Sequence, residues 1–148
     1  MRSNRNMVTI LAALIVAALL PNAFAQTPGI SLQIEKHAVL TRTGLVRIRI
    51  NITCGPFAGV EEFQEGHAGG GQSKTGAESE TGIDGTVLCD GVMRVHTAHL
   101  SPLTDAAFKH GPAGASASLI VCMLDGEEQM CFSGSTSRRI IIGGGRPR

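Results

Sequence analysis

The chain contains cysteines at four positions, and their spacing favours disulfide bonds over a metal site. They are Cys54, Cys89, Cys122 and Cys131. No two of them form the Cys-x-x-Cys pair of many zinc sites, and each lies inside or at the end of an apolar stretch. Four cysteines in a small chain of an oxidising compartment predict two disulfides, for which three pairings are possible.

The segment between Cys122 and Cys131 indicates one of these pairings. A hairpin with the loop 125–128 places the two cysteines directly opposite each other, and opposed Cα atoms ~4.5–5.5 Å apart can carry a disulfide. A tighter turn at 125–126 would instead place Cys131 opposite Ile120 and exclude the bond. We expect the wider loop, because its two adjacent glutamates are typical of a loop. The expected disulfides are Cys122 with Cys131 and, by elimination, Cys54 with Cys89.

The histidines show no spacing that would bind a metal ion. His96 and His99 are the closest pair, and in a strand a separation of three residues directs two side chains to opposite faces. They therefore cannot chelate one ion as an i, i+4 helical pair can. His37, His67 and His110 are scattered, so a site would have to be assembled from distant parts of the chain. We predict surface or loop histidines and no metal ligands.

Two segments resemble catalytic motifs and depart from them. Residues 69–75 resemble a phosphate-binding loop, but Ala68 and Ser73 stand where the pattern has glycine. Residues 114–118 resemble the nucleophile elbow of hydrolases, but the segment ends in serine and lies within a predicted strand. Adjacent carboxylates, as at 61–62, diverge in a strand, and the chain lacks the aromatic platforms of a glycosidase. We therefore predict no catalytic residue, no cofactor and no enzyme activity.

The first 25 residues have the form of an export signal. Arg2 and Arg5 precede an apolar run at 7–20, and the small residues of the segment 23–25 form a cleavage signal. The apolar run is shorter than the roughly 20 residues that span a bilayer, so an uncleaved anchor is the weaker alternative. We expect a Sec-type signal peptide at 1–25, cleavage after Ala25, and a protein in the secreted, periplasmic or cell-surface space.

The remaining chain has the length of one domain. We expect this domain at 26–142, followed by a disordered tail at 143–148. Loss of Arg2 and Arg5 leaves 11 Lys and Arg against 12 Asp and Glu, a formal charge of −1. This charge does not suit nucleic-acid binding, and no cysteine follows the cleavage position to carry a lipid. We expect neither a nucleic-acid partner nor a stable membrane anchor.

The segment from Leu45 to Cys54 has the clearest pattern in the chain. Its apolar residues alternate with polar ones, which is typical of a half-buried strand built from β-branched residues. Val46, Ile48, Ile50, Ile52 and Cys54 would face a core. Arg47, Arg49, Asn51 and Thr53 would face outward and form a possible contact face.

Further strands are expected throughout the mature chain. The apolar patterns place them at 30–34, 60–64, 86–89, 92–100, 113–124, 130–133 and 138–142. The segment 113–124 has few charges and is expected to be buried on both faces. Residues 66–82 are rich in Gly, Ser, Thr and Glu and are expected to be a mobile loop or an edge meander, and residues 103–109 a helical turn or a crossover loop. Short strands with regular turns predict an all-β protein, an antiparallel immunoglobulin-like β-sandwich of about seven strands.

Three short motifs resemble an uncharacterised family of small exported bacterial domains. They are Cys89-Asp90-Gly91, Phe108-Lys109-His110-Gly111-Pro112-Ala113 and Ser118-Leu119-Ile120-Val121-Cys122. The similarity covers residues 45–142, although this chain has His96-Thr97-Ala98 where the family often carries an aromatic residue. The resemblance implies a secreted, disulfide-linked β-sandwich and brings no known activity.

These observations predict a non-catalytic extracellular binding or interaction module. Its partner is expected to be an extracellular protein or surface. The alternative is a small-molecule carrier or hydrolase with a site between the sheets or under the segment 66–82.

Overall fold

The computed structural model describes residues 29–144, and this part of the chain is all-β. The predicted signal peptide at 1–25 lies outside the described residues. The strands are β1 (Gly29–Ile34), β2 (His37–Leu40), β3 (Val46–Gly55), β4 (Val60–Gln72), β5 (Ala77–Gly82), β6 (Arg94–Leu100), β7 (Gly111–Asp125) and β8 (Glu128–Gly144). The described residues contain no helix, so the helical turn considered for 103–109 is wrong and the crossover loop is confirmed.

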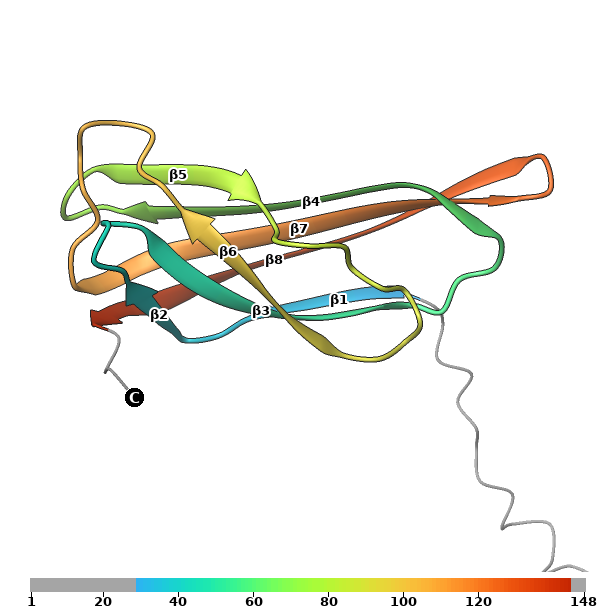
Figure 1. Cartoon of the computed structure of the whole chain (residues 1–148), viewed down its shortest axis with the longest axis horizontal. Coiled ribbons are helices and arrows are strands. Elements are labelled where there is room, and N and C mark those ends of the chain that lie inside the picture. Colours follow the sequence, from blue (N-terminus) through green and yellow to red (C-terminus); the bar gives the residue numbers. More distant parts are fainter. Residues whose placement is uncertain (1–28, 145–148) are drawn as a thin grey trace, which may run out of the picture.

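Hydrogen bonds join the strands in the order β1-β3-β2-β8-β7-β4-β5. β1 and β2 pair with the same edge of β3, and β6 pairs with its opposite edge. In space the strands lie in two layers, one of β1, β3 and β6 and the other of β8, β7, β4 and β5 (Figure 1). The short strand β2 joins them, because it pairs with β3 on one side and with β8 on the other. β2 runs parallel to β8, so the sheet is mixed and the expectation of a purely antiparallel arrangement is wrong.

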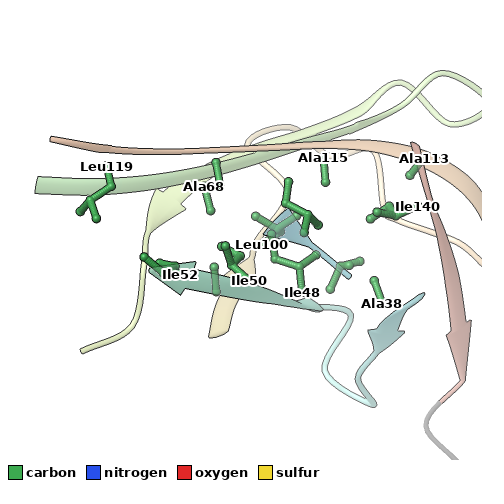
Figure 2. Packing of buried hydrophobic residues seen from close by; sticks show 14 of the residues in the cluster. Ala38, Ile48, Ile50, Ile52, Ala68, Leu100, Ala113, Ala115, Leu119 and Ile140 are labelled. Carbon is green, nitrogen blue, oxygen red and sulfur yellow. The ribbon is translucent and has the colours of Figure 1, made fainter. Parts of the chain in front are cut away.

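The predicted strand at 45–54 is confirmed as β3. Val46, Ile48, Ile50, Ile52 and Cys54 are each 0–1% exposed, whereas Arg47 and Arg49 are exposed on the other face. β-branched residues at every second position suit a pleated strand that is buried on one face. In Figure 2, Ile48, Ile50 and Ile52 point from β3 toward Ala68, Leu119 and Ala115 of the opposite layer. The core therefore lies between the two layers.

The segment predicted to be buried on both faces is buried on one face along most of its length, and on both only at 121–123. Along β7, Ala113, Ala115 and Ala117 are buried, and Gly114 and Ser116 between them are exposed. The prediction failed because all of these residues are small and so show no hydrophobic alternation. On the far side of the hairpin, the predicted strands at 130–133 and 138–142 are one continuous strand, β8. β8 also includes Gly143 and Gly144, so the predicted tail begins too early.

The segment 66–82 forms strands rather than a loop. Residues 66–72 continue β4 and pair with β7 on one side and, from His67 on, with β5 on the other. Glycine has a low β-propensity, and pairing on both edges compensates for it here. Residues 73–76 make the turn between the two strands. Within the described sheet β5 pairs only with β4 and is therefore an edge strand. The alternative expectation, a meander at the edge of a sheet, is close to this arrangement.

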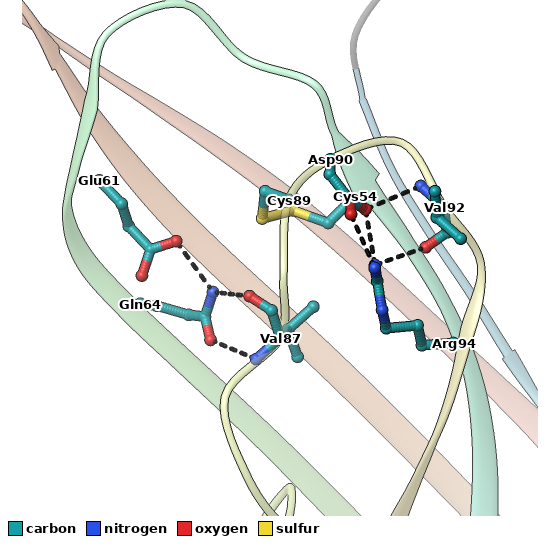
Figure 3. The surroundings of a disulfide bond; sticks show 8 residues. All are labelled: Cys54, Glu61, Gln64, Val87, Cys89, Asp90, Val92 and Arg94. Carbon is teal, nitrogen blue, oxygen red and sulfur yellow. Dashed lines mark hydrogen bonds and ion pairs between the residues drawn. A yellow bond between two sulfur atoms is a disulfide. The ribbon is translucent and has the colours of Figure 1, made fainter.

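Both predicted disulfides are present. Cys122 and Cys131 face each other in register across the β7–β8 hairpin, as the predicted loop requires. The loop is shorter than predicted, because Asp125 and Glu128 still pair and only Gly126 and Glu127 form the turn. The second bond joins Cys54 at the end of β3 to Cys89 in the segment between β5 and β6 (Figure 3).

The segment 86–89 is not a strand, although it was predicted to be one. The side chain of Gln64 takes the place of a strand partner: its Nε2 donates to the carbonyl of Val87 at 2.8 Å, and its Oε1 accepts from the Val87 N–H at 2.9 Å (Figure 3). Val87 is 3% exposed, so this amide satisfies backbone groups that would otherwise be buried without partners. Gln64 and the disulfide at Cys89 together hold this segment against the core.

The chain bends at Asp90-Gly91, and an ion pair closes the bend. Both guanidinium nitrogens of Arg94 bond to the Asp90 carboxylate, at 2.6 and 2.7 Å, and the Val92 N–H donates to the same carboxylate (Figure 3). These bonds favour the charged form, so they hold the pKa of Asp90 well below its usual range. The pKa of Arg94 is raised by the same pairing.

Candidate functional site

A groove of about 900 Å³ lies on the outer face of the β5-β4-β7-β8 layer. Its floor belongs to the central strands β4 and β7, where the outward positions carry only small residues. These are Gly69, Gly71, Gly114, Ser116 and Ser118. Larger side chains stand only toward the sides and one end of the groove, so the missing side chains on the central strands create it.

The strand register shows how the walls and the floor are arranged. Glu80 of β5 pairs with Gly69, and Gly69 pairs with Ser116, which pairs in turn with Ser137 of β8. The neighbouring row begins at Glu78 of β5 and ends at Arg139 of β8, with two glycines between them. One side of the groove is therefore acidic, and the other carries the hydroxyls of Ser135, Thr136 and Ser137. Arg139 lies beyond this wall, in an adjoining depression.

The glycines of the floor leave their backbone accessible. A Cβ added to Gly71 would meet only the carbonyl oxygen of Ala77, at 3.9 Å, and a Cβ added to Gly114 only that of Gly71, at 3.8 Å. Contacts at these distances are ordinary, and neither glycine has the positive φ that would strain another residue. The fold therefore does not require glycine at these two positions, unlike Gly70, whose Cβ would clash with Leu100.

His67 marks the end of the groove nearer the β7–β8 turn. Its Nε2 lies 2.8 Å from Oε1 of Glu65, and its cross-strand neighbour is Ser118. A serine nucleophile needs a base within hydrogen-bonding distance of its hydroxyl. Within residues 29–144, no hydrogen bond joins His67 to a serine.

A second polar cluster lies around Asp84 on the other layer. One carboxylate oxygen of Asp84 accepts from the hydroxyl of Thr97 and lies 2.9 Å from Nδ1 of His99. His96 lies 3.3 Å from the backbone carbonyl of Asp84 through its own Nδ1, and its Nε2 is buried. His96 faces inward and His99 outward, as their spacing predicted. The cluster ties the segment after β5 to β6.

The predicted contact face lies on the outer side of the three-stranded layer. Arg47, Arg49, Asn51 and Thr53 share one face of β3, away from the core. Arg47 is opposite His99 in the register, and Arg49 forms an ion pair with Glu35 at 3.5 Å. The groove lies on the opposite layer, so the two surfaces are separate and face away from each other.

Sequence reasoning considered both halves of the groove floor without joining them. The segment that resembles a phosphate loop supplies Gly69 and Gly71, and the segment that resembles a nucleophile elbow supplies Gly114, Ser116 and Ser118. The register brings the two segments together on neighbouring strands. The sequence feature that could have indicated the groove is the alternation in β7, where alanine lies on the buried face and glycine or serine on the exposed face.

Residues 29–144 contain no group of three or more His, Cys, Asp and Glu side chains that could hold a metal ion. The same residues include no helix that is long and apolar enough to cross a membrane. Searches of known protein families, characterised proteins and solved structures found no match to the chain. The resemblance to small exported bacterial domains therefore stays a prediction.

Proposed function

We propose that the protein is a non-catalytic extracellular binding module whose contact surface is the groove on the β5-β4-β7-β8 layer. The observation that carries the proposal is the floor of glycine and serine between an acidic side and a side of serine and threonine hydroxyls. Such a floor exposes backbone and hydroxyl groups to a ligand without obstruction by large side chains. From the spacing of neighbouring strands, β5 and β8 are ~14 Å apart across the floor, which is wide enough for an extended peptide.

We also propose that the two layers form an immunoglobulin-like sandwich. In that fold, strands C, F and G share one sheet and strands A, B and E the other. β4, β7 and β8 correspond in order to C, F and G, and β1, β3 and β6 correspond to A, B and E. β5 continues the sheet beside β4, as C′ does in variable-type domains. The bond between Cys54 and Cys89 does not link the equivalents of B and F, which is a departure from antibody domains.

The covalent structure supports a compartment outside the cytoplasm. Two disulfides in a domain of this size suit an oxidising environment outside the cytoplasm. The export signal expected at the N-terminus would deliver the chain there. A partner would accordingly be an extracellular or periplasmic molecule.

The arrangement favours a surface site over the carrier or hydrolase with a buried site. Ile34, Ile50 and Val121 fill the space between the layers and are all 0% exposed. The segment 66–82 forms part of the layer itself, so it does not cover a pocket as a loop would. Part of this segment contributes to the groove, which is large enough for a small molecule as well. The row of Arg47, Arg49, Asn51 and Thr53 remains a second candidate contact face.

Site-directed photo-crosslinking tests the proposal. A photoreactive residue replaces Ser116 in the groove or, as the matched control, Asn51 on the other layer, and the protein is irradiated in the cells that produce it. We expect a specific adduct from position 116 and none from position 51. Adducts from position 51 alone would move the contact surface to the β3 face, and the absence of protein adducts from either position would contradict a protein-binding module.

A further inference from the structure

A patch of exposed apolar side chains lies beyond the groove, near the turn that joins β7 and β8. It consists of Val60, Phe63, Ile120 and Leu124, here named the tip patch. Val60 is 74% exposed, Phe63 46% and Leu124 39%. The hairpin that carries two of these residues projects past the rest of the molecule (Figure 1). Contiguous exposed apolar side chains commonly mark an interaction site.

A β-bulge places these side chains on the same face. The register of β4 against β7 shifts between Glu61 and Phe63. Without the shift, Val60 and Phe63 would point to opposite faces, because they are three residues apart. With it, Val60 lies opposite Leu124, and Phe63 lies opposite Cys122 of the hairpin disulfide.

Acidic side chains cluster at the end of the molecule that carries the tip patch. They are Glu61, Glu62, Glu65, Asp125, Glu127 and Glu128, and all are exposed. The segments 58–67 and 118–135, which form this end of the molecule, contain no lysine or arginine. The Glu62 carboxylate is held against the patch, because it accepts a hydrogen bond from Nε2 of Gln129 on β8, across the intervening strand β7.

We propose that the tip patch docks an extended segment of a partner protein in which apolar residues alternate with lysine or arginine. Apolar side chains of such a segment would cover Phe63 and Leu124, and its cationic groups would lie against the surrounding carboxylates. The charge of the rim repels anionic lipid and nucleic acid, so a protein segment is the occupant that fits. The proposal does not depend on the groove, because it uses different residues.

A second copy of the chain is the other occupant to test. Its basic surface would be the β3 face, where Arg47 lies without an ion pair among the described residues and Arg49 is paired with Glu35. Contact between this face and the tip of a neighbouring copy would be head-to-tail and would not close. It would therefore produce open chains of molecules and not a dimer.

A designed peptide tests the proposal with the purified, disulfide-bonded protein. The probe is a decapeptide of alternating leucine and lysine, and the control peptide alternates leucine and glutamate. We expect calorimetry to show binding of the lysine peptide alone, and weaker binding as salt increases. The variant Phe63→Ser with Leu124→Ser should weaken binding at least about tenfold, and Glu127→Gln with Glu128→Gln should weaken it and reduce its dependence on salt.

A matched variant on the other layer serves as the control. Val95→Ser with Glu35→Gln removes one apolar side chain, 46% exposed, and one carboxylate from the β1-β3-β6 layer and should leave binding unchanged. Equal binding of the two peptides, no binding of the lysine peptide, or loss of binding only in the control variant would overturn the proposal. Concentration-dependent open assembly in sedimentation, abolished by Phe63→Ser, would also overturn it and would identify a second copy as the occupant.

Discussion

Gly70 of β4 lies against Leu100 of β6 across the core, so closely that a Cβ on Gly70 would be 2.7 Å from Cδ1 of Leu100. Its neighbour Gly71 faces the groove, where the nearest atom to an added Cβ is a carbonyl oxygen at 3.9 Å. Two adjacent glycines therefore serve opposite faces of one strand. Gly70 permits the layers to approach, and Gly71 keeps the groove open.

This difference predicts opposite effects of the same substitution. Gly70→Ala should destabilise the fold by about 1–3 kcal/mol, because Leu100 is 1% exposed and has little room to move. Gly71→Ala should leave stability unchanged or raise it by about 0.5–1 kcal/mol, because alanine loses less backbone entropy than glycine in a strand. Urea denaturation of the two variants measures the difference. Equal midpoints would show that the two glycines do not face the environments described.

The alternation in β3 predicts a second contrast between neighbours. Ile50 is 0% exposed, so Ile50→Ala should cost about 2–5 kcal/mol through lost burial and the cavity left behind. Arg49→Ala removes an exposed ion pair with Glu35 and should cost less than about 1 kcal/mol. Chemical denaturation compares the two, and a larger effect at Arg49 would reverse the assigned faces.

The disulfides should differ in their contribution to stability. Cys54 and Cys89 are separated by 35 residues and Cys122 and Cys131 by 9. In the chain-entropy model, removal of the first bond should cost about 4 kcal/mol and of the second about 3 kcal/mol. Double serine variants at each pair, unfolded in denaturant, test this order. Non-reducing peptide mapping should find only these two linkages, and a peptide that joins Cys54 to Cys122 would contradict the structure.

The ion pair between Asp90 and Arg94 predicts a response to acid. The folded-state pKa of Asp90 is lowered, so its contribution to stability is present above the unfolded pKa of about 4 and is lost as the pH falls below that value. Asp90→Asn should therefore reduce stability at pH 7 and have a smaller effect at pH 2. Because the pair is exposed, the difference should be small. Denaturation at both pH values measures it, and an equal effect of Asp90→Asn at both would exclude the pairing as its cause.

The sequence predicted those elements whose pattern depends on local chemistry. The alternation of isoleucine with arginine defined β3, and the glutamates between Cys122 and Cys131 indicated the register of the hairpin and its disulfide. The parallel pairing of β2 with β8 was missed. β2 has only four residues, and its partner lies about a hundred residues along the chain, so no local pattern reports the pair.

The groove was missed because small residues carry little information about burial. Glycine in β4 resembled a flexible loop, and alternating alanine and serine in β7 resembled a strand buried on both faces. The glycine-rich half of β4 is a strand because it pairs with β5 on one side and with β7 on the other. The outward positions of Arg47 and Arg49 on β3 could be predicted from the sequence, because these large charged residues alternate with isoleucine.

The affinity of the partner captured from position 116 for a groove-filled variant shows directly whether the groove binds that partner. Gly71→Thr with Gly114→Thr places side chains on the floor at positions where an added Cβ meets no closer contact than 3.8 Å. We expect the dissociation constant to rise at least about tenfold while the melting temperature does not fall, because the threonines block the ligand and suit a strand. An unchanged dissociation constant in a folded variant would show that the groove is not the binding surface.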